Sequence, residues 1–309
     1  MSGKVFLLAT CLLAAGCASN NVTQTGVVTD ATMNTVTILT GSNQTMSFST
    51  LNADRSELKG LRLGDRVNVR FSGPYEPGLE IQKISTAPIF PLLFEKAIRL
   101  QSVSGSSAVY VLFTDEERLA LIFDTEGRMI RTLERRKLPN GLFTWNVADD
   151  DTWNLRKMPS GLWTITQRTK TLFTQSTSAT DESLGQFTTL HYEGLLPAAD
   201  CPGIRYELFI RHRTHSGDGT FLLNLTYLEA ENGKDMTFSY LGRRYTLKGS
   251  ADNENAIVWQ CRSDNGQELF NFLVENQSRR LTLLTDDFKR IDSPFNYSLE
   301  KRTDLKSAG

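Results

Sequence analysis

The sequence predicts an all-β protein, and three observations support that fold class. After residue 20, short runs of alternating apolar and polar residues recur, and they are separated by Gly, Pro, Asn or Asp turn signals. No window keeps apolar residues at the i, i+3, i+4 and i+7 spacing over the length of a helix. The 309 residues are 39 % hydrophobic and 22 % charged, which is the composition of a folded globular protein.

Charge and residue counts argue against several classes of function. Lys and Arg total 34 and Asp and Glu total 35, which gives a net charge of −1. A nucleic-acid-binding protein carries a basic excess, so we expect no nucleic-acid partner. Three His and four Cys leave few residues for a metal centre or a His-based active site. No Gly-x-Ser-x-Gly, His-Glu-x-x-His, P-loop or dinucleotide fingerprint is present, so we expect no enzymatic activity.

The N-terminus predicts export and a lipid anchor. Lys4 precedes an apolar run over residues 5–15, which is too short to span a bilayer but suits a secretory signal. The run leads into Leu-Ala-Ala-Gly-Cys, which resembles a bacterial lipobox. We therefore predict a lipoprotein signal peptide over residues 1–16 and a mature chain held by diacylglyceryl and palmitate lipid on Cys17. By resemblance to enterobacterial lipoproteins, Ala18 rather than Asp directs the protein to the outer membrane.

Residues 17–86 predict a small barrel of OB type. About five short strands fall within this length, as in OB folds. Val67 and Val69 alternate with polar residues on one of these strands, so one of its faces is predicted to be buried. OB barrels that bind single strands use exposed aromatic residues and a basic groove. Because Phe48 and Phe71 read as core residues, we predict a structural or protein-contact module instead.

Residues 87–99 are predicted to be a linker, because two prolines within four residues disfavour both a helix and an inner strand. Residues 100–178 predict a β-meander of about six strands, with Gly-containing turns between the apolar runs. Trp145 and Trp163 are the expected core anchors of this segment.

The third segment carries a recognisable motif. Residues 192–204 read Tyr-Glu-Gly-Leu-Leu-Pro-Ala-Ala-Asp-Cys-Pro-Gly-Ile. This stretch resembles the N-terminal domain of the NlpE (CutF) family of outer-membrane lipoproteins, and two further stretches match the family's central and closing strands. The resemblance covers residues 187–302 and implies a lipocalin-like antiparallel barrel, which the hairpin signals of this segment also predict. The residues that match the family motif are Asp200, Cys201, Pro202 and Gly203.

The cysteines depart from the family pattern. Ala198 stands where the family has the first residue of a Cys-x-x-Cys, so neither a local disulfide nor a local two-thiol Cu(I) site is available. Apart from Cys17, the mature chain keeps Cys201 and Cys261. Two remaining thiols in an oxidising compartment usually pair, so we predict a Cys201–Cys261 disulfide. The domain order also departs, because the enterobacterial protein carries its OB-like domain after the barrel.

His212 and His215 are the candidates for a metal site. On an extended strand, a three-residue step places side chains on opposite faces, and the neighbouring Arg211 and Arg213 repel a cation. We therefore favour a basic, exposed hairpin tip that contacts an acidic partner. Copper is the metal that the resemblance implies, but without a complete Cys-x-x-Cys we expect no resident cofactor.

The resemblance implies a non-enzymatic, lipid-anchored outer-membrane protein that faces the periplasm. It further implies roles in copper resistance, surface sensing and the envelope stress response, with an inner-membrane sensor kinase as partner. In this interpretation the Cys201–Cys261 pair is the redox-sensitive element. The alternative is a periplasmic binding module that holds a small apolar ligand or, like a lysozyme inhibitor, blocks an enzyme.

Overall fold

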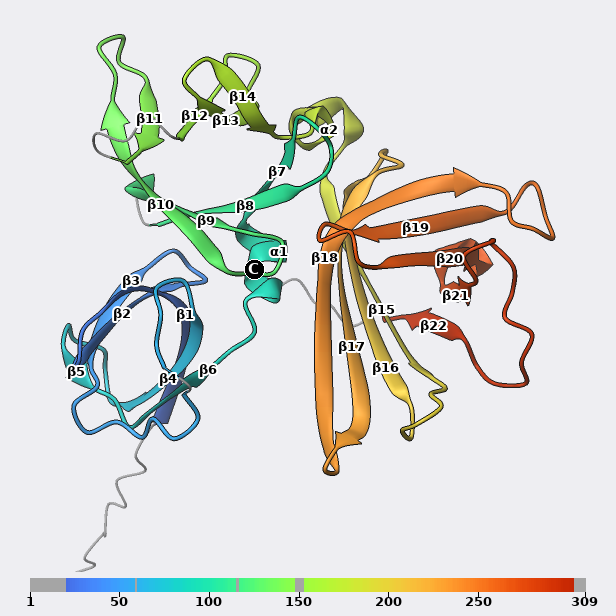
Figure 1. Cartoon of the computed structure of the whole chain (residues 1–309), viewed down its shortest axis with the longest axis horizontal. Helices are drawn as coiled ribbons and strands as arrows, with labels where there is room; N and C mark the ends of the chain where they lie inside the picture. The colour runs from blue at the N-terminus through green and yellow to red at the C-terminus, as the bar shows by residue number, and fades with distance from the viewer. Residues whose placement is uncertain (1–20, 59, 115–116, 148–152, 303–309) are drawn as a thin grey trace, which may run out of the picture.

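The computed structural model describes residues 21–58, 60–114, 117–147 and 153–302. Within them the chain forms three β units in sequence, with short helices between the units (Figure 1). The all-β fold class predicted from the sequence is confirmed. The predicted signal peptide and the predicted lipid site at Cys17 lie outside the described residues. Among the helices that are described, none is long and apolar enough to cross a membrane.

The first unit is a curled sheet with OB-type connectivity. Its strands are β1 (Asn21–Ala31), β2 (Thr35–Thr40), β3 (Thr45–Ser49), β4 (Arg66–Ser72), β5 (Leu79–Glu80) and β6 (Lys83–Thr86). The strand order is β5-β3-β2-β1-β4-β6, and only Ile81 and Gln82 separate the two edge strands along the chain. One segment therefore pairs with β3 at one edge and with β4 at the other, which curls the sheet towards the predicted barrel. Val67, Val69 and Phe71 are buried, as their alternation predicts.

A short helix follows the first unit, so the prediction that two prolines exclude a helix here is wrong. In α1 (Phe90–Lys96), Pro91 occupies the first turn, where no backbone N–H bond is lost and the fixed φ of proline suits the helix. Leu92, Leu93 and Phe94 are buried in a cluster that all three units share. The other buried members of this cluster are Val27, Leu39, Tyr110, Leu112, Leu121, Phe123, Leu222 and Leu241.

The second unit is a closed eight-stranded barrel. Its strands are β7 (Ile98–Ser102), β8 (Ala108–Phe113), β9 (Leu119–Phe123), β10 (Met129–Lys137), β11 (Phe143–Asn146), β12 (Asn154–Lys157), β13 (Trp163–Gln167) and β14 (Lys170–Thr174). Each strand pairs with the next, as the predicted meander requires, and β14 then pairs with β7 to close the ring. The predicted count of about six strands is too low because β7 and β12 were missed. Trp145 and Trp163 meet at 5.3 Å between ring centroids, beside Phe113.

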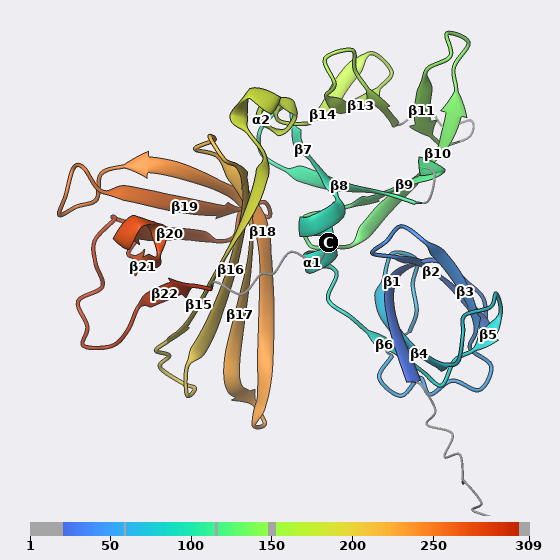
Figure 2. The ribbon, with the colours of Figure 1, turned by 180° about the vertical axis from the view of Figure 1, so that it is seen from behind.

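The third unit is a second closed eight-stranded barrel, as predicted (Figure 2). The helix α2 (Thr177–Thr180) and the 3-10 turn Glu182–Leu184 lead into it, and a 3-10 turn at Asn276–Ser278 joins two of its strands. Its strands are β15 (Phe187–Leu196), β16 (Ile204–Arg213), β17 (Gly219–Glu231), β18 (Lys234–Lys248), β19 (Ile257–Ser263), β20 (Leu269–Glu275), β21 (Arg280–Leu284) and β22 (Ser298–Lys301). The pair β15–β22 closes the ring.

A continuous hydrophobic cluster occupies the interior of the third barrel. Inward residues alternate with outward residues along each strand, which follows from the two-residue period of a strand. On β17, Phe221 and Leu223 point inward and join this cluster, whereas Leu222 points outward and joins the cluster around α1. The part of the outer face of β17 and β18 around Leu222 and Leu241 is therefore covered by α1, while the interior is filled by the barrel's own side chains.

Candidate functional site

The family motif forms the loop between β15 and β16, at one end of the third barrel. Gly203 is buried and has a φ of +156°, and a Cβ there would lie 2.9 Å from Leu195 Cδ1 and 3.1 Å from the carbonyl oxygen of Leu196. The carbonyl of Gly203 accepts hydrogen bonds from the backbone N–H of Leu228, at 3.0 Å, and from the thiol of Cys201, at 3.4 Å. Pro202 and Asp200 are exposed on the same loop. The motif thus folds a tight connection and holds one thiol near the surface.

Cys261 lies far from this loop, so the predicted Cys201–Cys261 disulfide is wrong. Both cysteines are free thiols, and Cys261 is fully buried on β19. Strand pairing connects Cys261 through Arg244 and Gly219 to His212, which is at the far end of β16 from the motif loop. Eight residues of β16 separate that level from the loop, or roughly 26 Å at about 3.3 Å per residue. A disulfide requires Cα atoms within about 7 Å of each other.

A buried arginine closes the barrel end near Cys261. The Arg244 side chain is 2 % exposed, and its Nη1 donates to the carbonyl of Gly217 and the hydroxyl of Thr246, both at 2.6 Å. Its guanidinium lies 5.0 Å from the centroid of the Trp259 ring, and its Nε has no hydrogen-bond partner. Burial raises the pKa of the Cys261 thiol to about 12, although the charge of Arg244 opposes that shift. Cys261 is therefore a protonated core residue at neutral pH.

The two candidate metal ligands do not share a site. His212 Nδ1 lies 2.7 Å from the carbonyl oxygen of Arg213, and burial lowers the pKa of this imidazole. His215 is exposed on the following loop, where its backbone N–H donates to the carbonyl of Leu184. Over the described ranges, no group of three or more His, Cys, Asp or Glu side chains is arranged to hold a metal. The expected exposed hairpin tip is also partly wrong, because Arg211 and Arg213 are half-buried.

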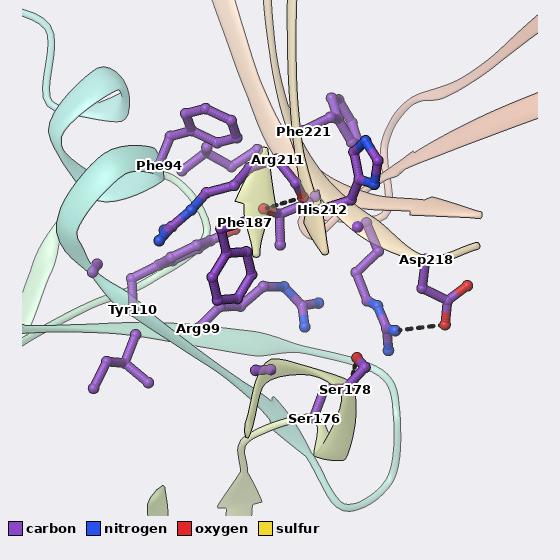
Figure 3. A pocket seen from close by; sticks show the side chains of 18 of the residues that line it. Phe94, Arg99, Tyr110, Ser176, Ser178, Phe187, Arg211, His212, Asp218 and Phe221 are labelled. Atoms are coloured by element: carbon purple, nitrogen blue, oxygen red, sulfur yellow. Dashed lines mark hydrogen bonds and ion pairs between the residues drawn. The ribbon is translucent and has the colours of Figure 1, made fainter. Parts of the chain in front are cut away.

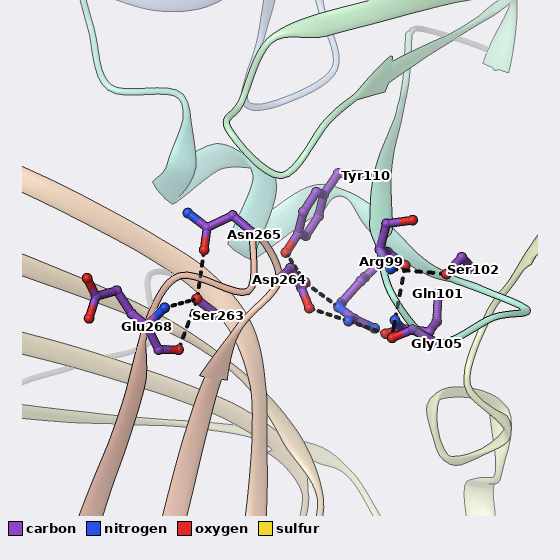
Figure 4. Close-up of polar contacts among 10 residues, drawn as sticks. Arg99, Gln101, Ser102, Gly105, Tyr110, Ser263, Asp264, Asn265 and Glu268 are labelled. Atoms are coloured by element: carbon purple, nitrogen blue, oxygen red, sulfur yellow. Dashed lines mark hydrogen bonds and ion pairs between the residues drawn. The ribbon is translucent and has the colours of Figure 1, made fainter. Parts of the chain in front are cut away.

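A buried polar contact joins the second and third barrels (Figure 4). Asp264, in the turn between β19 and β20, accepts hydrogen bonds from Nε of Arg99 at 2.6 Å and from the hydroxyl of Tyr110 at 2.6 Å. A second nitrogen of Arg99 also donates to this carboxylate. The Arg99 and Asp264 side chains are only 10 % and 7 % exposed. Burial alone would lower the pKa of Arg99, but the bonded carboxylate outweighs it and raises that pKa.

A pocket of about 260 Å³ opens beside this contact, between the two barrels (Figure 3). Its walls come from α1, from β7 and β8 of the second barrel, from α2 and from β15 to β18 of the third barrel. Five cationic side chains line it together with several aromatic rings. The cations are Lys96, Arg99, Arg211, Arg213 and Arg243, and the aromatic residues are Phe94, Tyr110, Phe187 and Phe221.

Two of these arginines contact one phenylalanine ring. The register of β15 and β16 places Phe187 opposite Arg213, and Arg211 lies two residues along on the same outer face. The two guanidinium carbons lie 4.6 Å and 4.5 Å from the Phe187 centroid. Arg213 donates to two carbonyl oxygens in α2 and to the carbonyl of Gly185 beyond it. Arg211 Nη1 donates to the carbonyl of Glu95 at 3.3 Å. The sequence pattern does not reveal this site, because the residues that contact Arg211 and Arg213 are distant from them along the chain.

Comparison with known proteins identifies the third barrel. Residues 192–294 match the family model described as the NlpE N-terminal domain. The match runs from β15 to the segment before β22 and includes the motif loop and Cys261. No curated protein and no solved structure matches the chain. The resemblance predicted from the motif is therefore confirmed for this barrel.

Proposed function

Because residues 192–294 form an NlpE N-terminal domain, we propose that the protein is an NlpE-type lipoprotein of the bacterial outer membrane that acts through protein contacts rather than by catalysis. The observation that carries this proposal is the family match, which falls on a closed barrel whose loop keeps the Asp-Cys-Pro-Gly part of the family motif at residues 200–203. NlpE is a family of envelope lipoproteins, so membership is consistent with a membrane-associated location. The finer parts of the proposal are the anchor, the signalling role and the copper role.

The anchor is proposed to be lipid on Cys17, on a chain that faces the periplasm. Metabolic labelling with an alkyne analogue of palmitate, followed by separation of the two membranes, tests it. We expect label on the wild type in the outer membrane, and no label on a Cys17→Ala variant. An Ala18→Asp variant should keep the label but remain in the inner membrane. Label on Cys17→Ala, or an unlabelled wild type, would contradict the anchor.

The role is proposed to be envelope-stress or surface sensing, with an inner-membrane sensor kinase as partner. Overproduction should then raise an envelope-stress reporter, and Ala18→Asp should raise it further because it keeps the protein beside the kinase. A reporter that responds to neither protein would contradict this role.

The motif end of the third barrel supports a contact with a partner. Leu195 and Phe238 are 53 % and 45 % exposed, and strand pairing places both at the level of the motif loop. Leu195 lies on the outer face of β15, whereas Phe238 shares the face of Leu225 at the barrel end. Exposed large apolar side chains are typical of protein contact sites. A Leu195→Ser/Phe238→Ser double variant should lose the reporter response at unchanged protein level. The matched control is Leu142→Ser, an equally exposed leucine on the second barrel, which should keep the response.

The copper role is proposed to follow from signalling rather than from a thiolate copper site. Two observations support this. Among the described residues no cysteine lies beside Cys201, and Cys261 is buried with a thiol pKa of about 12. Deletion of the protein should lower survival on copper, and a Cys201→Ser variant should restore survival fully. Cu(I) titration against a chelator should show equal, weak uptake by wild type and variant. Tight uptake that Cys201→Ser abolishes would reverse this part of the proposal.

A further inference from the structure

We propose that the pocket between the second and third barrels binds a small organic anion, with its carboxylate or phosphate group on Arg211 and Arg213 and its apolar part against the aromatic wall. This inference does not depend on the signalling role, because it rests only on the charge, shape and lining of the pocket. Its volume of about 260 Å³ is just below the ~300–1,000 Å³ of pockets that hold drug-sized ligands, so the ligand is smaller than those.

The first argument is uncompensated charge. Five cationic side chains line the pocket, and with Asp264 only three carboxylates accompany them, which leaves two positive charges in excess. Arg99 is neutralised by Asp264 and Arg243 by Asp218. In the described part of the chain, neither Arg211 nor Arg213 has a carboxylate within ion-pair distance. Burial lowers the pKa of Arg211, and the nearby Glu95 only partly opposes this shift, while Arg213 has a longer-range attraction to the exposed Asp181. Once these two ion pairs are set aside, Lys96, Arg211 and Arg213 remain with Glu95 as the one other carboxylate of the pocket lining, so these three side chains share the excess positive charge.

The second argument is preorganisation. Three carbonyl oxygens fix the guanidinium of Arg213, and both guanidinium groups lie over the Phe187 ring. A guanidinium that is already held in place loses little conformational entropy when an anion binds. Nε and Nη2 of Arg211 have no partner within the described residues, so this group keeps free donors for an anion. A planar guanidinium offers carboxylate or phosphate two parallel hydrogen bonds.

The third argument is the apolar wall beside the arginines. Phe94 comes from α1, Tyr110 from the second barrel and Phe187 from the third barrel. Phe94 and Tyr110 are buried, and Phe187 is 45 % exposed. Such a wall lowers the local dielectric, which strengthens attraction between a guanidinium and an anion relative to bulk water. It also favours a ligand with an apolar body over inorganic phosphate alone. The positive charge would attract any anion, and the apolar wall favours those anions that also carry an apolar group.

The test is isothermal titration calorimetry of the full mature chain, without its lipid, with phenyl phosphate and with 3-phenylpropionate. We expect saturable binding of at least one probe, at one site per chain. An Arg211→Met variant should weaken that binding by ~10-fold or more, because methionine keeps an apolar side chain of similar length but lacks the guanidinium group. The matched control Arg205→Met removes an exposed arginine from the same face of the same strand and should bind as the wild type does. Arg211→Lys should bind between wild type and Arg211→Met.

Two further measurements keep the outcomes distinct. Inorganic phosphate and 3-phenylpropanol carry the charge and the apolar group separately, and each should bind more weakly than the joined probes. Thermal unfolding of Arg211→Met without ligand checks that the variant is folded. Absence of saturable binding of either probe up to ~10 mM would overturn the proposal, as would equal binding by a folded Arg211→Met. Equal binding of inorganic phosphate and phenyl phosphate would overturn the part assigned to the apolar wall.

Discussion

Replacing Asp264 by Ala should lower the free energy of unfolding and uncouple the second and third barrels. The substitution leaves the Arg99 guanidinium without its carboxylate, and that side chain is only 10 % exposed. Breaking a buried ion pair from one side costs about 3–5 kcal/mol, because the remaining charge stays buried and unpaired. Arg99 also lines the open pocket, where water reaches part of it, so we expect the lower end of that range. The hydroxyl of Tyr110 loses its acceptor as well.

The four tryptophans allow each barrel to be followed separately during urea unfolding. Trp145, Trp153 and Trp163 belong to the second barrel, and Trp259 belongs to the third. A Trp259→Phe chain therefore reports on the second barrel, and a chain that keeps only Trp259 reports on the third. We expect the two fluorescence transitions to coincide with Asp264 present, and to separate when it is Ala.

Two controls give this measurement its meaning. The double variant Arg99→Met/Asp264→Leu replaces the pair by apolar side chains and should recover most of the loss, since no charge is left buried. Asp218→Ala breaks a more exposed ion pair with Arg243, with 46 % of the Asp218 side chain exposed, and should cost at most about 1 kcal/mol. If Asp264→Ala also cost less than about 1 kcal/mol, or if the transitions still coincided, the buried pair would not couple the barrels.

Three further outcomes are expected. At pH 8 a maleimide should label Cys201 in the native protein and Cys261 only after unfolding, and neither result should depend on a reductant. If labelling required a reductant, the two cysteines would be disulfide-bonded after all. Burial of Glu275 raises its pKa, but hydrogen bonds from Thr282 and Arg290 outweigh this and lower it. Glu275 therefore stabilises the fold above its unfolded pKa of about 4.3, and this stability is lost as pH falls through the lower folded value. Glu275→Gln should flatten that part of a urea-stability profile against pH, and an unchanged profile would contradict the shift. Gly203→Ala should lower the stability of the third barrel by about 1 kcal/mol or more, measured by Trp259 fluorescence, since the added Cβ meets Leu195 and a carbonyl; an unchanged midpoint would show that the loop relaxes.

The strand pattern could be predicted from the sequence, but barrel closure in the second unit could not. Alternating residues such as Val67 and Val69 are a local signal, and they are buried as expected. The pairing of β14 with β7 joins residues about 70 positions apart, for which no local pattern exists. Strand β12 was missed because it has only four residues and buries only Leu155. Helix α1 leaves no helical period in the sequence, because seven residues are too few to show one and Pro91 predicts a helix break rather than a first turn.

The candidate site was less accessible to sequence reasoning than the fold. The pattern places Arg211 and Arg213 on one outward face, and that part was available from their spacing. The spacing does not reveal that the carbonyl of Glu95, 116 residues earlier, accepts a hydrogen bond from Arg211 on this face. The disulfide prediction failed for a different reason, since it counted thiols without following the strand registers. The hairpins that lead from Cys201 to Cys261 place the two thiols at opposite ends of the barrel.

The packing of α1 has a consequence for how the protein can be divided. Leu222 and Leu241 point outward from the third barrel, yet they are only 2 % and 4 % exposed, because α1 and its cluster cover them. A fragment that begins at β15 would expose both leucines and the neighbouring Phe209 to solvent as a hydrophobic patch. Such a fragment is expected to self-associate, and its binding behaviour would include a surface that the whole chain never exposes. Excision of this barrel for study therefore requires either retention of residues 90–96 or polar replacements at Leu222 and Leu241.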